Sequence, residues 1–75
     1  MNKARRASLN MIINQLTDIK NDLENVRDDE EVAYDNMPES FQESERGETM
    51  QEAIDSMYDA VDSLDEAIEA LEGLF

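Results

Sequence analysis

Between Met50 and Phe75 the apolar residues are separated by alternating gaps of four and three positions. The row consists of Met50, Ile54, Met57, Val61, Leu64, Ile68, Leu71 and Phe75. This spacing keeps one apolar stripe on one side of an α-helix, as in the contact seam of a coiled coil. The segment is therefore predicted to be a helix that lies along another helix.

A second apolar row with the same spacing lies in the N-terminal half of the chain. It runs through Leu9, Ile12, Leu16, Ile19, Leu23 and Val26, and continues more weakly through Glu30 and Ala33. No Gly or Pro interrupts this stretch, so a helix is predicted from about residue 3 to residue 35. Met11 and Ile13 lie beside the row and widen the apolar face of that helix.

Residues 36–43 are predicted to form the loop between the two helices. Pro38 cannot continue a helix and restricts the backbone of the residue before it. Ser44 is a good N-cap for a second helix over about residues 44–73, which Gly73 would terminate. Gly47 costs about 1 kcal/mol relative to Ala inside a helix. It therefore either allows a close backbone approach or marks a frayed helix start.

Two long helices joined by a short loop form an antiparallel hairpin. We therefore expect one all-α domain over residues 1–75, an antiparallel, coiled-coil-like two-helix hairpin. In this hairpin the basic residues Lys3, Arg5 and Arg6 are expected beside the acids Glu66, Glu69 and Glu72.

The C-terminal helix carries a flanking row of small residues that suggests a second neighbour. Ala53, Ala60 and Ala67 repeat every seven positions beside the apolar seam. A lone hairpin has a thin core, so a homodimer that forms a four-helix bundle is predicted. The residues assigned to the core of the hairpin or dimer are Leu9, Ile12, Leu16, Ile19, Leu23, Val26, Ile54, Met57, Val61, Leu64, Ile68 and Leu71.

The charge and the residue types of the chain exclude several classes of function. Twenty acidic and six basic residues give a net charge of −14, which repels nucleic acids and anionic membranes. The chain has no Cys and no His, so the commonest metal ligands and general base are missing. No catalytic site, cofactor or metal is expected. No apolar run is long enough for a membrane span and no secretory signal is visible, so a cytoplasmic location is expected.

Two acidic groups are better explained as solvated surface than as metal sites. The four consecutive acids of residues 28–31 point in different directions around a helix, so they do not converge on one ion. Glu66, Glu69 and Glu72 would touch a cation only loosely.

The candidate partner-binding residues form two groups. Asp55, Asp59, Asp62, Glu66 and Glu69 make a carboxylate stripe on a helix that has no basic residue after Arg46. The stripe is either a mimic of nucleic-acid phosphates or an ordinary solvated face. Glu39, Phe41 and Arg46 lie near the loop. Phe41 either closes the end of the core or anchors a partner, and Ser40, Ser44 and Arg46 either cap and bridge the helix ends or form a recognition edge.

The loop string N-M-P-E-S-F-Q-E-S-E-R, residues 36–46, resembles a motif of small acidic proteins. These proteins are encoded by phages, prophages and mobile elements of Gram-positive bacteria. The resemblance covers the chain loosely and implies a phage setting in a bacterial cytoplasm, without implying a mechanism.

Together these observations favour a non-enzymatic interaction protein that binds a basic surface of a host protein. Mimicry of nucleic acid and inhibition of a defence or DNA-binding protein are forms of this function. The alternative is a structural or assembly factor whose helix seam joins a partner's coiled coil. Neither function involves direct contact with nucleic acid or with a membrane.

Overall fold

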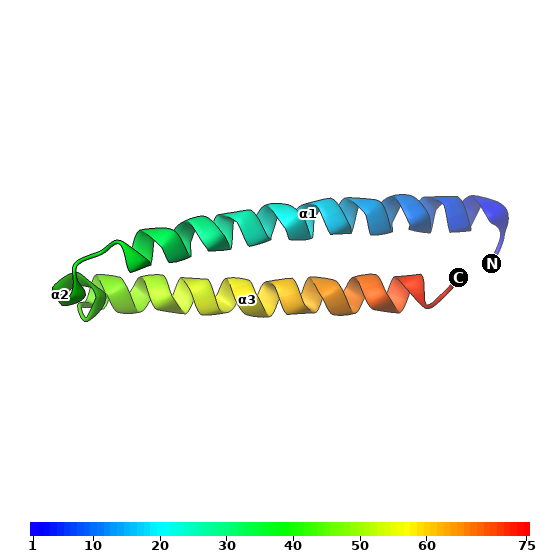
Figure 1. Cartoon of the computed structure of the whole chain (residues 1–75). Helices are drawn as coiled ribbons and strands as arrows, with labels where there is room; N and C mark the ends of the chain where they lie inside the picture. Colours follow the sequence, from blue (N-terminus) through cyan, green and yellow to red (C-terminus); the bar gives the residue numbers. More distant parts are fainter.

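The computed structural model describes all 75 residues and contains only helices. Helix α1 spans Lys3–Asp35, the short helix α2 spans Glu39–Gln42, and α3 spans Glu45–Glu72. Helices α1 and α3 run antiparallel, α2 lies in the turn, and both termini lie at the other end (Figure 1). The predicted all-α hairpin is confirmed, and α2 is a helical turn inside the predicted loop.

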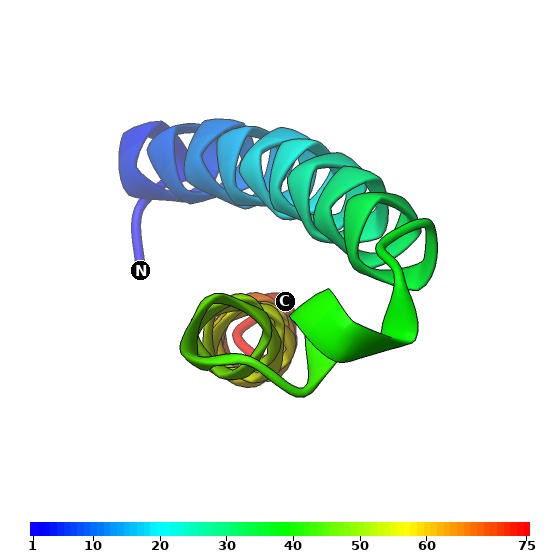
Figure 2. The same cartoon turned by 90° about the vertical axis from the view of Figure 1, so that its left-hand side faces the viewer.

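The hairpin is a rod. Its principal extents are 58 × 15 × 12 Å and its radius of gyration is 17.2 Å. A compact chain of this length has a radius of gyration of about 11 Å. The end-on view in Figure 2 shows the two long helices lying one against the other with no third long helix beside them.

The core is one row of residues on α3. Ile54, Val61 and Ile68 are buried and repeat every seven positions, with Ile54 only 2% exposed. On α1 only Ile13 is buried. Burying an aliphatic side chain of this size contributes about 1.5–3 kcal/mol, so this row is the centre of the apolar contact between the helices, and half-buried leucines on both helices and half-buried methionines on α3 extend it.

The face of α1 that meets α3 differs from the predicted seam. The exposed residues are Ile12, Ile19 and Val26, and the residues that follow them, Ile13, Lys20 and Arg27, are buried or half-buried instead. Ile12, Ile19 and Val26 are therefore not buried between the two helices of one chain, and their assignment to the core of a dimer stays a prediction. The long stems of Lys20 and Arg27 cover apolar surface while their charged ends reach polar partners, which makes this rotation of α1 favourable.

Side chains cap the helix ends. The Asn2 side chain accepts a hydrogen bond of 2.8 Å from the backbone N–H of Arg5 and caps α1. Ser44 caps α3 as predicted, because its Oγ accepts from the backbone N–H of Gly47 at 3.4 Å. Ser40 lies inside α2 and caps nothing. Instead Gln42 Nε2 donates to the carbonyl oxygen of Tyr34 at 2.8 Å and satisfies the end of α1.

Gly47 allows a close approach between α3 and α2. A Cβ atom at this position would lie 2.1 Å from the carbonyl oxygen of Gln42 and 2.5 Å from that of Phe41. Both atoms belong to backbone, so no side-chain rotation relieves the overlap. The close approach, and not a frayed start, explains this glycine.

The basic N-terminus does not pair with the acids of α3. Lys3, Arg5 and Arg6 form no salt bridge; the three in the chain involve only Lys20 and Arg27 as cations. Figure 1 shows that α1 extends past the C-terminal end of α3. The predicted pairing is wrong because the first turns of α1 overhang that end.

Replacement of Gly47 by Ala tests the close approach. Ala is the better helix former by about 1 kcal/mol, but the overlap with backbone should outweigh this gain, since overpacking costs about 1–3 kcal/mol. Gly47→Ala is therefore expected to lower the free energy of unfolding by up to about 2 kcal/mol in urea denaturation at fixed protein concentration.

Gly73→Ala is the matched control for this substitution. A Cβ at Gly73 meets only backbone oxygens at 3.5 Å, an ordinary contact distance. This variant should unfold at nearly the same urea concentration as the parent. Equal or greater stability of Gly47→Ala would contradict the assigned role of Gly47.

Candidate interaction surfaces

The hairpin has two long sides that differ in chemistry. The inward row of α1 is Ile13, Lys20 and Arg27, and that of α3 is Ile54, Val61 and Ile68. In each helix, the residue one position before a member of this row points to one side of the hairpin, and the residue four positions after it points to the other side. Because α1 and α3 are antiparallel, the same direction of rotation leads to the same side of the hairpin in both helices. Contacts of Lys20 and Arg27 with α3 mark one side, which we name the polar side; the opposite one is the apolar side.

An ion pair joins the two helices on the polar side. Lys20 Nζ donates to Asp65 Oδ1 at 2.7 Å and lies 3.7 Å from Glu24 Oε1. The hydrogen bond to Asp65 is the main reason that the pKa of Lys20 is raised above its usual value. The pair is partly open to solvent, so it fixes the level of α1 against α3 more than it adds stability.

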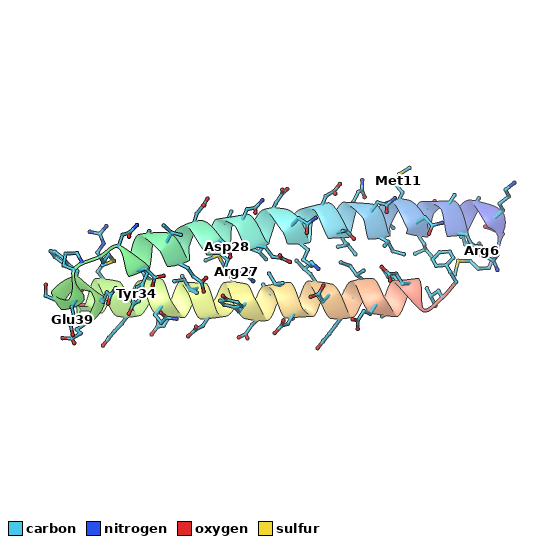
Figure 3. The ribbon with its side chains drawn as sticks, viewed as in Figure 1. Arg6, Met11, Arg27, Asp28, Tyr34 and Glu39 are labelled. Atoms are coloured by element: carbon cyan, nitrogen blue, oxygen red, sulfur yellow. The ribbon has the colours of Figure 1, made fainter.

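A second polar contact lies two helical turns closer to the loop. The Arg27 guanidinium lies 4.3 Å from the centroid of the Tyr58 ring and 3.0 Å from Asp28 Oδ1. The Tyr58 hydroxyl donates to Glu31 Oε1 at 2.6 Å. This hydrogen bond, followed by desolvation, raises the pKa of Tyr58. Figure 3 shows Arg27 and Asp28 at the boundary between the helices.

The carboxylates of α3 avoid the apolar side. The predicted stripe is fully exposed, and its members Asp55, Asp62 and Glu69 lie in one row with Asp59 and Glu66 in the next. We name these five residues the acidic face. Only Asp55 has a hydrogen bond, which it accepts from Gln51 Nε2 at 3.0 Å. The other acids of α3 also lie on the polar side or the outer edge. The negative charge of α3 is therefore concentrated on one part of the helix surface.

The apolar side carries two parallel rows of exposed apolar residues. They are Ile12, Ile19, Val26 and Ala33 on α1, and Ala53, Ala60, Ala67 and Leu74 near or within α3. Half-buried Leu16, Leu23, Met57 and Leu64 lie between the two rows. Farther around α3 on this side come small uncharged residues, Thr49, Ser56, Ser63 and Ala70. The result is an apolar surface that covers most of the length of the rod and is interrupted near the loop by Glu30 and Arg46.

The loop residues form a third surface at the end of the rod. Phe41 is 54% exposed, so it does not close the core, and it lines a shallow apolar pocket with Ala33, Met37, Arg46 and Met50. Arg46 forms no salt bridge, so it does not bridge the helix ends. Glu39 begins α2 with its side chain in solvent (Figure 3).

The structure therefore separates the candidate partner-binding residues into two places. The acidic face lies along the middle of α3, whereas Glu39, Phe41 and Arg46 lie at the turn. Sequence reasoning missed the contacts of Lys20 and Arg27 with α3. Their seven-residue spacing after Ile13 was the available signal, because it continues an inward row through two long, half-buried side chains.

The chain shows neither a metal centre nor a spanning helix. No three acidic side chains are grouped closely enough to hold a metal ion. Each long helix of the rod carries too many charged residues to cross a bilayer.

The Tyr58–Glu31 hydrogen bond predicts an alkaline dependence of stability. Because the folded state raises the pKa of Tyr58, this contribution is complete below the ordinary tyrosine value and is lost as pH rises through the raised one. In a Tyr34→Phe background Tyr58 is the only tyrosine. Its tyrosinate absorbance should then titrate above pH 10, and Glu31→Gln should move the titration down. An unmoved titration in Glu31→Gln would contradict the assigned contact.

Comparison with known proteins gives no match for this chain, whether with protein-family models, curated proteins or solved structures. The resemblance of the loop to small acidic phage proteins therefore stays a prediction.

Proposed function

We propose that this protein is a non-enzymatic interaction module whose acidic face binds a basic surface of another protein. The target is a surface built to hold a nucleic-acid strand, so that the acidic face competes with nucleic acid. The proposed setting is the cytoplasm of a bacterial host, and it rests on the resemblance of the loop to phage proteins.

The sorting of charge around α3 is the observation that carries this proposal. An acidic helix that needs only solubility can distribute carboxylates over every exposed row. Here the acids occupy adjacent rows on one side and the outer edge, while the apolar side of α3 holds Arg46 as its single charged residue. Carboxylates concentrated in this way produce a directional negative field that steers a basic partner.

The spacing of the carboxylates supports a nucleic-acid-like surface. The five acids of the acidic face lie within the 15 residues from Asp55 to Glu69. At a rise of about 1.5 Å per residue this is one negative charge for about 4.5 Å of helix. A single nucleic-acid strand carries one phosphate for about 3.4 Å of duplex axis. A groove lined with Lys and Arg for one strand would therefore meet a similar linear density of charge.

The apolar side supports a second candidate function, that of an assembly factor. Ile19 is 53% exposed and Val26 57% exposed on a long, regular helix. Such a stripe is suited to packing against helices of a coiled-coil partner. Salt distinguishes the two functions, because binding through carboxylates weakens steeply with ionic strength and apolar packing does not.

Neutralising the acidic face tests the first function. The test variant combines Asp55→Asn, Asp59→Asn, Asp62→Asn and Glu66→Gln, all at exposed positions. Affinity capture from a Gram-positive lysate at low salt is expected to lose its basic partner in this variant. With the parent protein, a single-stranded oligonucleotide should displace the same partner.

The matched control removes four negative charges from α1 instead. Its substitutions are Asp18→Asn, Asp22→Asn, Asp29→Asn and Asp35→Asn, which lie at exposed positions outside the acidic face. This control should keep most of the binding. The proposal fails if both variants lose the partner equally, since net charge alone would then explain binding, or if the test variant binds with unchanged affinity.

A further inference from the structure

We propose that a second copy of this chain covers the apolar side, with the two hairpins antiparallel and related by one two-fold axis. The proposal uses the surface opposite the acidic face and does not depend on the proposed function. It names the face, the orientation and the residue pairing of the dimer.

The exposed area of one hairpin is the first argument. The chain exposes 5506 Å² at a mass of 8.6 kDa. A compact monomer of this mass exposes about 4,700 Å². The excess, about 800 Å², follows from the elongated shape and is similar to the area that each partner contributes to a protein–protein interface of standard size. The apolar side runs along the rod, so a partner of the same length is needed to cover it, and a second hairpin has this length.

The positions of the two apolar rows are the second argument. In an antiparallel dimer each row meets itself in reverse, so the two-fold axis must pass through the middle of each row. The middle of the α1 row lies between Ile19 and Val26, and that of the α3 row lies between Ala60 and Ala67.

The contacts within the hairpin show that these two midpoints lie at the same level. Lys20 contacts Asp65, and Arg27 contacts Tyr58. The midpoint of the α1 row, between Ile19 and Val26, therefore lies beside the part of α3 that contains the midpoint of the α3 row. One two-fold axis can therefore pass through the midpoints of both rows. The contacts that fix the position of α1 along α3 lie on the opposite, polar side.

The same axis gives complementary side-chain sizes. It places Ile12 opposite Ala33 of the second copy, and Leu74 opposite the second copy's Ala53. Ala33 lines the shallow apolar pocket at the loop end. The larger residues at the open end of one hairpin thus meet small residues and a pocket on the other. The apolar side of α3, with its Ala and Ser residues, lets the two α3 helices approach closely.

Charge selects the antiparallel orientation. Residues 1–20 carry four basic side chains and one acid, whereas residues 21–35 carry seven acids and one base. An antiparallel dimer brings the positive half of each α1 against the negative half of the other. Arg5 continues the row of Ile12 and reaches the acidic turn near Glu39 of the second copy. A parallel dimer would place the strongly acidic loop halves together, which like-charge repulsion disfavours.

Sedimentation equilibrium with a charge on the apolar side tests the dimer. The parent is expected to be a dimer at micromolar concentration. Ile19→Lys should weaken the dimer at least about 100-fold, because both copies then bury an unpaired charge. Met11→Lys is the control, since Met11 is 63% exposed and points away from α3 (Figure 3). It adds the same charge and should leave the dimer intact, and circular dichroism should show both variants helical.

Cross-linking tests the orientation, and the absence of native cysteine makes it clean. An Ile12→Cys chain mixed with an Ala33→Cys chain should be joined by a short thiol-specific cross-linker. Two Ile12→Cys chains should not be, because their thiols lie roughly 30 Å apart in the antiparallel dimer. A monomeric parent, a dimer that withstands Ile19→Lys as well as Met11→Lys, or preferential joining of Ile12→Cys to itself would overturn the proposal.

Discussion

The fold depends on the burial of one row of α3, formed by Ile54, Val61 and Ile68, against α1. Each of these residues contributes about 1.5–3 kcal/mol, whereas ordering the backbone costs about 1–2 kcal/mol for every residue. Such a narrow core leaves little margin for a chain of 75 residues. The stability of this chain therefore depends more than that of a compact domain on two further features. One is the close fit at the turn, where Gly47 meets the backbone of α2, and the other is a partner that covers the remaining apolar surface.

The rotation of α1 decides which surface remains open. Its inward row contains Lys20 and Arg27, whose stems shield α3 while their charged ends contact Asp65 and the Tyr58 ring. Ile19 and Val26, which are more apolar, are left outside. A hairpin selected only to be stable as a monomer would use its best apolar row inside. The observed arrangement is consistent with an apolar row that serves a second contact.

The sequence was sufficient to predict the hairpin but not the rotation of α1 about its own axis. Apolar spacing predicted both long helices and the residue type predicted the Ser44 cap, because both depend on local geometry. Two rows of α1 lie either side of Leu9 and Leu16, however, and spacing alone does not say which one faces α3. Only the packed pair shows that Gly47 meets backbone and that α1 overhangs α3, since both facts depend on how far one helix is shifted along the other. The acidic face was visible in the sequence because helical spacing alone defines it.

The two proposed surfaces reinforce each other through the geometry of α3. If the Ala rows of two α3 helices meet, the outer-edge acids Glu52, Asp59 and Glu66 of both copies lie along one edge in two antiparallel rows. This edge carries twice the charge of a single hairpin. A basic partner that contacts both rows neutralises their mutual repulsion, so it binds the dimer more tightly than the monomer. By linkage, the same partner stabilises the dimer by an equal free energy. Partner binding and self-association would then strengthen each other without any change in the fold of the hairpin.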